Sequence, residues 1–136
     1  MKILLLLLCL FVISPVIVHA QSDYKVVFDV TSKDTTIHET VIRQLTLIRG
    51  VNPEAKLEVV IYGQGLDIVL KNKKQAMVVQ QLITEKDISF KVCAMTLDRN
   101  KIGKDQLITG VEIVPDGIYE IISKQQQGWG YIKVAH

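Results

Sequence analysis

Residues 57–65 read Leu-Glu-Val-Val-Ile-Tyr-Gly-Gln-Gly, and this stretch indicates the fold class most directly. Four consecutive apolar residues at 59–62 are typical of a parallel strand that is buried on both faces of its sheet. Gly63 and Gly65 follow directly, and glycines after a strand permit the tight turn that leads the chain away from it. The stretch therefore predicts a central strand of an α/β domain, with a loop at the carboxyl edge of the sheet.

The segments on both sides of this stretch alternate between strand and helix patterns. Short runs rich in β-branched and aromatic residues predict strands over 24–30, 57–62, 89–94, 111–114 and 129–134. Apolar residues at helical spacing predict helices over 36–49, over 72–84 and from Asp116 to Gly128. A helical turn and a short helix, broken near Gly103, are expected over 95–108. This alternation indicates a three-layer α/β/α sandwich with a mostly parallel sheet.

Particular residues predict the helix ends and the faces that turn inward. Thr36 and Glu39 have the spacing of a capping box at the start of the first helix. Asn72 is placed to cap the second helix. The apolar side of the last helix is expected to consist of Ile118, Ile121 and Ile122. Alternation along the last strand places on one face Trp129, Tyr131 and Lys133.

The composition is that of one small globular domain. The 136 residues are 49% hydrophobic and 22% charged, which supplies enough apolar material for a core and excludes general disorder. A net charge of +2 with 6% aromatic residues argues against a nucleic-acid binder, which carries a clear basic stripe. The three histidines do not have the spacing of metal ligands, so no metal site is predicted.

The first twenty residues have the layout of a secretory signal peptide. Lys2 is the only charge before Asp23, residues 3–18 are almost continuously aliphatic, and small-residue cleavage is expected after Ala20. The apolar run is short for a membrane span and contains Pro15. The sequence therefore predicts a signal peptide over 1–20, one domain over 21–136, a periplasmic or secreted location, and no membrane segment after cleavage.

Removing residues 1–20 from the 136 leaves 116 residues with a single cysteine, Cys93. A free cysteine is often a small buried hydrophobe, and this structural interpretation is the more frequent one. The alternative is a reactive thiolate at the end of the third strand, where the start of a helix would stabilise its charge. No Cys-x-x-Cys motif is present, so a dithiol mechanism within one chain is excluded.

Ligands of open α/β sheets bind outside the carboxyl ends of the strands, and three features are expected there, the first being residues 29–34 after the first strand. Cys93 ends the third strand, and Gly63 and Gly65 form a loop after the second. This glycine pair lacks the rest of a dinucleotide or phosphate-loop motif, so no nucleotide cofactor is predicted. His38 lies in the first turn of a helix; we expect a solvated surface histidine, with a Cys93–His38 nucleophile–base pair as the alternative.

Three segments resemble the DsrE/DsrF-like proteins, in particular small stand-alone members with an export signal. They are residues 57–70 (LEVVIYGQGLDIVL), 90–97 (FKVCAMTL) and 110–133 (GVEIVPDGIYEIISKQQQGWGYIK). The last is the most specific, with its Gly-Val-x-x-Val-Pro-x-Gly opening followed by a helix, Gly-Trp and Tyr-Ile-Lys. The resemblance covers most of residues 24–134.

The resemblance implies a three-layer α/β sandwich that assembles as homo-oligomers, often trimers or hexamers. In sulfur-relay members a cysteine accepts sulfur as a persulfide and passes it on, which implies a sulfurtransferase-like role for Cys93 and a donor or acceptor protein as partner. Cys93 and Thr96 match a family pattern like Cys-Ala-Asn-Thr-Met, whereas Met95 stands in place of its amide residue. A second interpretation is a non-enzymatic homo-oligomeric binding module with a structural cysteine.

Overall fold

The computed structural model describes residues 23–134, so the predicted signal peptide lies outside the described residues. Five strands form one sheet in the order β4-β3-β2-β1-β5, and every neighbouring pair is parallel. Their bounds are β1 (Lys25–Val30), β2 (Lys56–Ile61), β3 (Ile88–Cys93), β4 (Glu112–Val114) and β5 (Gly130–Lys133). The sheet expected to be mostly parallel is thus parallel throughout.

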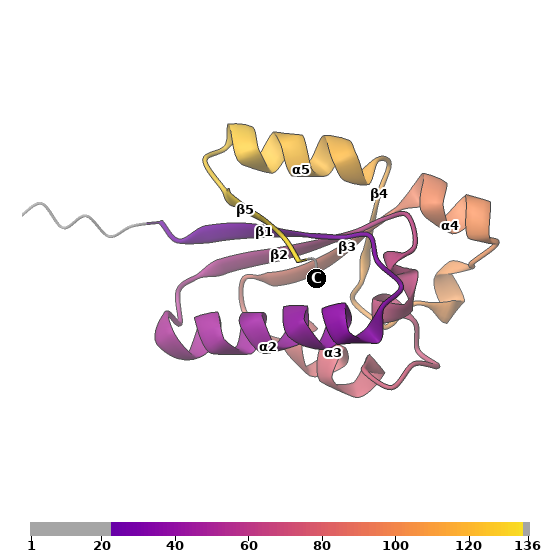
Figure 1. Cartoon of the computed structure of the whole chain (residues 1–136), viewed down its shortest axis with the longest axis horizontal. Helices are drawn as coiled ribbons and strands as arrows, with labels where there is room; N and C mark the ends of the chain where they lie inside the picture. Colours follow the sequence, from indigo (N-terminus) through magenta and orange to yellow (C-terminus); the bar gives the residue numbers. More distant parts are fainter. Residues whose placement is uncertain (1–22, 135–136) are drawn as a thin grey trace, which may run out of the picture.

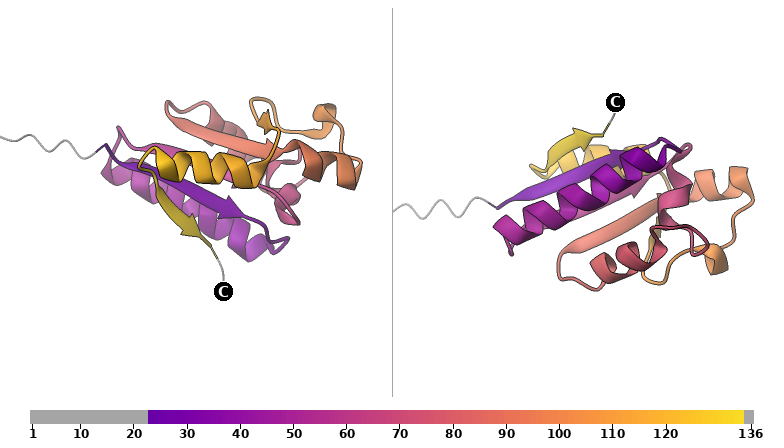
Figure 2. Two further views of the ribbon diagram at one scale, coloured as in Figure 1. Left: turned by 90° about the horizontal axis from the view of Figure 1, so that it is seen from above. Right: turned by 60° about the horizontal axis from the view of Figure 1, so that its bottom comes forward.

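Helices cover both faces of the sheet, which confirms the predicted three layers (Figure 1). One face carries α2 (Thr35–Val51) and α3 (Ala76–Ile83), which come forward together in the right-hand view of Figure 2. The other face carries α5 (Gly117–Gln126). The chain steps from β1 to β4 in one direction and then returns across the sheet from β4 to β5. Because such crossovers are right-handed, reversing the direction moves the connecting helix to the opposite face.

The carboxyl edge of the sheet is closed by shorter elements (Figure 1). A five-residue 3₁₀ helix, η1 (Gly65–Val69), follows β2, and α4 (Ala94–Asn100) follows β3 without a linker. A second 3₁₀ turn, η2 (Lys104–Gln106), leads toward β4. The helical turn and break expected over 95–108 are confirmed by α4 and η2, whereas η1 was not expected from the sequence.

The two faces of the sheet carry unequal cores. Along β2, Leu57, Val59 and Ile61 join the large cluster beneath α2 and α3. The alternate residue Val60 belongs to a small cluster beneath α5, whose buried members among the described residues are Val27, Val60 and Ile121. Residues 59–61 therefore do belong to a strand buried on both faces, as the pattern predicts, whereas Tyr62 follows the strand and is partly exposed.

The predicted helix starts need two corrections. Asp34, not Thr36, caps α2, because its side chain accepts a hydrogen bond from the backbone N–H of Thr36 at 2.8 Å. Glu39 does not close a capping box and instead pairs with Lys74 at 3.0 Å. Residues 71–75 form turns, so α3 begins after Gln75 rather than at Asn72.

The apolar side predicted for the last helix is also wrong. Ile121 is buried, but Ile118 and Ile122 are 53% and 48% exposed. The sheet-facing positions beside Ile121 belong to Glu120 and Lys124, whose charged groups bond to partners on β2 and β3. Since the sheet presents charged residues to α5, the helix turns a mixed face inward and leaves two isoleucines outside. The shared face of Trp129, Tyr131 and Lys133 is confirmed, because all three lie on the α5 side.

Candidate functional site

Cys93 lies at the junction between strand β3 and helix α4. It is the last residue of β3 and, with an extended backbone, the N-cap of α4. Alternation along β3 places Cys93 on the same face as Lys91, which contacts Glu120 of α5. Only 4% of the residue is exposed. The thiol is therefore packed at the carboxyl edge, beneath the start of α5.

Hydrogen-bond donors gather around the sulfur of Cys93. Burial by itself raises the pKa of this thiol, but bonds from the backbone of Gly117, from the backbone and hydroxyl of Thr96 and from the backbone of Met95 outweigh it. The pKa of Cys93 therefore lies below that of an ordinary thiol, because these donors favour the thiolate. In the thiol form, Sγ lies 3.9 Å from the carbonyl oxygen of Pro115.

Thr96 connects Cys93 with the glycine loop. Its hydroxyl accepts a hydrogen bond from the backbone N–H of Gly63 at 3.2 Å and bonds to the sulfur of Cys93. A hydroxyl has one proton and two acceptor lone pairs, so it can accept from Gly63 and donate to the thiolate at once. Three of the residues singled out from the sequence, Cys93, Thr96 and Gly63, thus lie together.

Gly117 is a site residue that the sequence reasoning missed. A Cβ at this position would lie 3.3 Å from the side chains of Tyr62 and Val60, which is closer than ordinary packing. The absence of a side chain lets the first turn of α5 approach the sheet and direct its N–H toward Cys93. The side chain of Asp116 caps the same turn through the N–H of Ile118 at 2.9 Å. The Pro-Asp-Gly sequence at 115–117 was a signal for this tight start.

The two glycines after β2 have structural tasks. Gly63 has a φ of +59°, a left-handed conformation that favours glycine. A Cβ on Gly65 would lie 2.4 Å from the carbonyl oxygen of Val30, at the end of β1. The loop also borders a cavity of about 330 Å³, whose polar lining residues include Lys33, Gln64 and Asn100.

His38 does not lie on the surface, so that expectation is wrong. It is fully buried, with Nε2 2.7 Å from the carbonyl oxygen of Ser32 and Nδ1 3.2 Å from the side-chain amide of Gln75. A carbonyl only accepts, so Nε2 carries the proton and Nδ1 accepts from the amide. His38 thus links the segment after β1 with the start of α3, and neither of these ring contacts involves Cys93.

A second polar cluster lies on the α5 face around Asp29 of β1. The Oδ2 atom of this buried carboxylate accepts hydrogen bonds from the hydroxyls of Tyr131 at 2.6 Å and Tyr62 at 3.3 Å, and Lys133 Nζ lies 3.6 Å away. The other oxygen, Oδ1, is buried without a hydrogen-bond partner. Two of the partners come from β5, so the cluster ties this edge strand to β1.

Replacing Tyr131 with phenylalanine is expected to destabilise the domain by about 1 kcal/mol near neutral pH, because it removes the hydrogen bond to Asp29. This bond, followed by burial, raises the pKa of Tyr131 to about 12, above the value of about 10 for an unfolded tyrosine. The contribution is therefore complete below pH 10 and is lost as the pH rises to 12. Urea unfolding should show a difference in free energy of unfolding between the wild type and Tyr131→Phe that shrinks over this range. A difference that does not change with pH would contradict the assignment.

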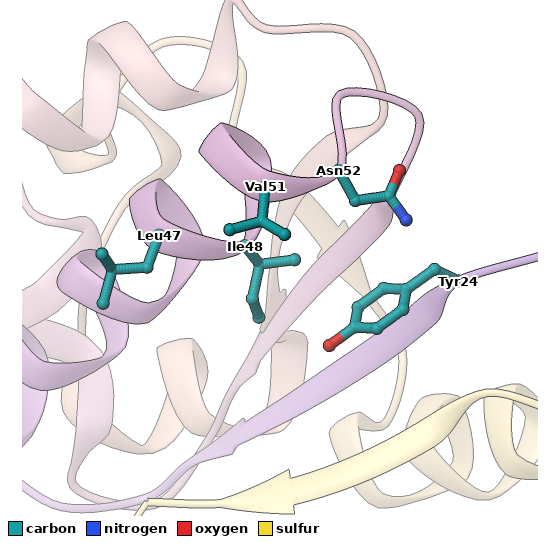
Figure 3. A pocket seen from close by; sticks show the side chains of 5 residues that line it. All are labelled: Tyr24, Leu47, Ile48, Val51 and Asn52. Atoms are coloured by element: carbon teal, nitrogen blue, oxygen red, sulfur yellow. The ribbon is translucent and has the colours of Figure 1, made fainter.

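An apolar groove of about 470 Å³ lies apart from these groups, between the end of α2 and the residue that precedes β1 (Figure 3). Leu47, Ile48 and Val51 line it from the helix, and Tyr24 lines it from the opposite side. Within residues 23–134 no cluster of three metal-ligating side chains is found, and no helix is long and apolar enough to cross a membrane.

The fold and the site define a small parallel α/β domain with a buried cysteine at the carboxyl edge of its sheet. A family model described as the DsrE/DsrF-like family matches residues 25–134, and the chain belongs to this family. The resemblance seen in the sequence is thereby confirmed. No functionally curated protein matches the chain.

Solved structures agree with the fold. The protein of unknown function MTH1491 from Methanobacterium thermoautotrophicum is 27% identical, with a TM-score of 0.78 over 82% of this chain and 100% of its own. The ychN protein from E. coli is 16% identical, with a TM-score of 0.68 over 82% of this chain and 99% of its own. The conserved protein of unknown function BT1422 from Bacteroides thetaiotaomicron is 10% identical, with a TM-score of 0.68 over 81% of this chain and 94% of its own.

Proposed function

We propose that Cys93 accepts sulfane sulfur as a persulfide and passes it to an acceptor thiol. The observation that carries this proposal is the set of donors from Gly117, Thr96 and Met95 around the sulfur, which favours the thiolate despite its burial. A thiolate is the nucleophile that sulfur transfer requires. Membership in the DsrE/DsrF-like family supports the same chemistry.

The proposed cycle needs no external oxidant or reductant. The Cys93 thiolate attacks a sulfur atom of a polysulfide, a new S–S bond forms, and the old S–S bond breaks with its electron pair on the leaving polysulfide. An acceptor thiolate then attacks the outer sulfur of the Cys93 persulfide, and the Cys93 thiolate leaves. The donors of Gly117 and Thr96 stabilise the same thiolate as nucleophile in the first step and as leaving group in the second.

Intact mass measurement after incubation of the processed protein with inorganic polysulfide tests this function. We expect a mass increase of one or more sulfur atoms that a reducing thiol removes again. If the outer sulfur moves to a low-molecular-weight thiol when that thiol is added, the experiment demonstrates transfer as well as binding. An unchanged mass after polysulfide treatment would overturn the proposal.

The alternative is a binding module in which Cys93 is only packed, and the 4% exposure of this residue favours it. A thiol reagent distinguishes the two functions. Modification of Cys93 in the native protein supports sulfur transfer, because a donor must reach the same atom. Modification only after denaturation supports the binding module.

The thiolate of Cys93 is expected to form at lower pH than that of an ordinary cysteine, for which half-titration lies near pH 8.5. The ultraviolet absorbance of the thiolate can be followed against pH, with Cys93→Ser as the blank that removes the tyrosine contribution. The midpoint should lie below that of an ordinary cysteine. A midpoint at or above that value would show that burial outweighs the donors.

We also propose that the protein is exported, with residues 1–20 removed as a signal peptide, and that its sulfur donor or acceptor protein is periplasmic or secreted. The layout of residues 1–20 supports this location. The mature amino terminus of the protein purified from the exporting cell should be Gln21. An amino terminus that retains the apolar segment would contradict the cleavage.

Self-association into a trimer or hexamer is a further part of the proposed function. Exposed apolar side chains on the outer side of α5, Ile118, Tyr119 and Ile122, support it, because contiguous apolar groups of this kind mark contacts with another protein. Light scattering of the processed protein should give a mass of three or six chains. A monomeric mass would exclude this assembly.

A further inference from the structure

Helix α5 is attached to the sheet mainly by charged groups. The buried apolar residues between them, among those described, are Val27, Val60 and Ile121, whereas the opposite face carries the large core. At the centre of the α5 face lies Glu58 of β2, a carboxylate that is only 2% exposed. A buried carboxylate is costly unless it is paired, so its partners govern how the helix sits.

Lys124, near the end of α5, is the principal partner of Glu58. Its Nζ lies 3.0 Å from Glu58 Oε2 and 4.6 Å from the centre of the Trp129 ring. Lys91 of β3 lies 3.2 Å from the same oxygen and 3.0 Å from Glu120 of α5. Two lysines and two glutamates therefore join β2, β3 and the sheet-facing side of α5.

The same helix begins at the sulfur of Cys93. Gly117, its first residue, bonds to the sulfur through its backbone and lies against Val60 and Tyr62 with no space for a side chain. Lys124 is seven residues further along, which corresponds to roughly 10 Å of a rigid helix. A shift of the anchored end of α5 on the sheet is thus transmitted to the donor that faces Cys93.

We propose that Glu58, through Lys124, positions the first turn of α5 over Cys93 and thereby sets the reactivity of the thiolate. Glu58 is a positioning residue: it bonds to Lys91, Lys124, Ser89 and Glu120, and it does not contact the sulfur itself. The inference rests on the proposed function for its biological meaning, but the geometry that carries it is independent of any sulfur donor.

Two single substitutions separate positioning from direct electrostatics. In Glu58→Gln a negative charge is lost, and in Lys124→Met a positive charge is lost. If these charges acted directly on the thiolate, the first substitution would lower the pKa of Cys93 and the second would raise it. If they act by holding α5 in place, both substitutions weaken the bond from Gly117 and both raise the pKa.

The test is the pH titration of the Cys93 thiolate by its ultraviolet absorbance, with Cys93→Ser in each background as the blank. We expect the midpoint to rise by about one pH unit in both variants. At a pH below both midpoints, the thiolate fraction of each variant is then about tenfold smaller than that of the wild type. Lys124→Arg should restore the midpoint. Glu54→Gln is the matched control, because Glu54 forms an exposed ion pair with Lys86, and it should leave the midpoint unchanged.

Circular dichroism shows whether each variant is folded. If Lys124→Met unfolds, Glu120→Gln replaces it as a milder variant, because Glu120 lies at the rim of the network. Loss of the Glu120 charge should raise the midpoint in the same direction, but by less. Unchanged midpoints in the folded variants, or shifts of opposite sign, would overturn the proposal. Failure of the wild-type protein to take up sulfur would instead count against the proposed function, since the titration uses no sulfur donor.

Discussion

Replacing Cys93 with serine is expected to abolish the uptake of sulfur from polysulfide completely. After cleavage behind Ala20 the chain contains no other cysteine, so no second thiol can take over the reaction. Serine has nearly the same size, but its hydroxyl does not ionise in this pH range and cannot form a persulfide. Intact mass after polysulfide treatment should therefore show the unmodified protein only.

The fold should survive this substitution, because serine fits the packed position of Cys93 and its hydroxyl can accept hydrogen bonds from the donors that surround the sulfur. Thr96→Val serves as the companion variant: it keeps the thiol, removes one donor to the thiolate and leaves the N–H of Gly63 without its acceptor. We expect this variant to take up sulfur more slowly, at a rate that recovers as the pH is raised. A sulfur adduct that persists in Cys93→Ser would refute the assignment of the acceptor.

The strands were predictable from the sequence because each has a local pattern. The run 59–62 predicts burial on both faces without reference to any other segment, and the structure buries Val59 and Val60 completely. The position of Cys93 at the end of β3 followed from the same local patterns. The family resemblance implied the same three-layer sandwich, and the match over residues 25–134 confirms the family.

The surroundings of the site were less predictable because they depend on partners far away in the chain. Asp29 is 102 residues from Tyr131, and His38 is 37 residues from Gln75, so their burial has no local signature. Helix α5 shows why periodicity alone can mislead. Its isoleucines indicate an apolar stripe, but the buried Glu58 on the sheet requires Lys124 on the inward side.

The tasks of the two glycines after β2 also depend on distant segments. Gly63 and Gly65 are two residues apart, and the sequence does not distinguish their tasks. In the structure Gly63 needs its left-handed conformation and presents its N–H to Thr96. Gly65 needs the missing side chain, because the backbone of β1 passes close to it. The two glycines should therefore respond differently to substitution.

Gly65→Ala is expected to destabilise the domain by about 3 kcal/mol, the upper part of the usual range for overpacking. The new Cβ would lie 2.4 Å from the carbonyl oxygen and 3.0 Å from the carbonyl carbon of Val30. These are backbone atoms of a fully buried residue at the end of β1, so they cannot rotate away as a side chain would. Either β1 or the start of η1 must move, which disturbs the parallel pairing of β1 with β2.

Gly50→Ala provides the matched control for this substitution. Gly50 lies inside α2 and has no atom within 4 Å of the position of a new Cβ. Alanine is favoured over glycine in a helix by about 1 kcal/mol, so this variant should be slightly more stable than the wild type. Urea midpoints should therefore move in opposite directions for the two Gly→Ala variants. If the midpoint of Gly65→Ala equals that of the wild type, the loop after β2 relaxes without cost. The close approach of Gly65 to β1 would then not explain why glycine stands at this position.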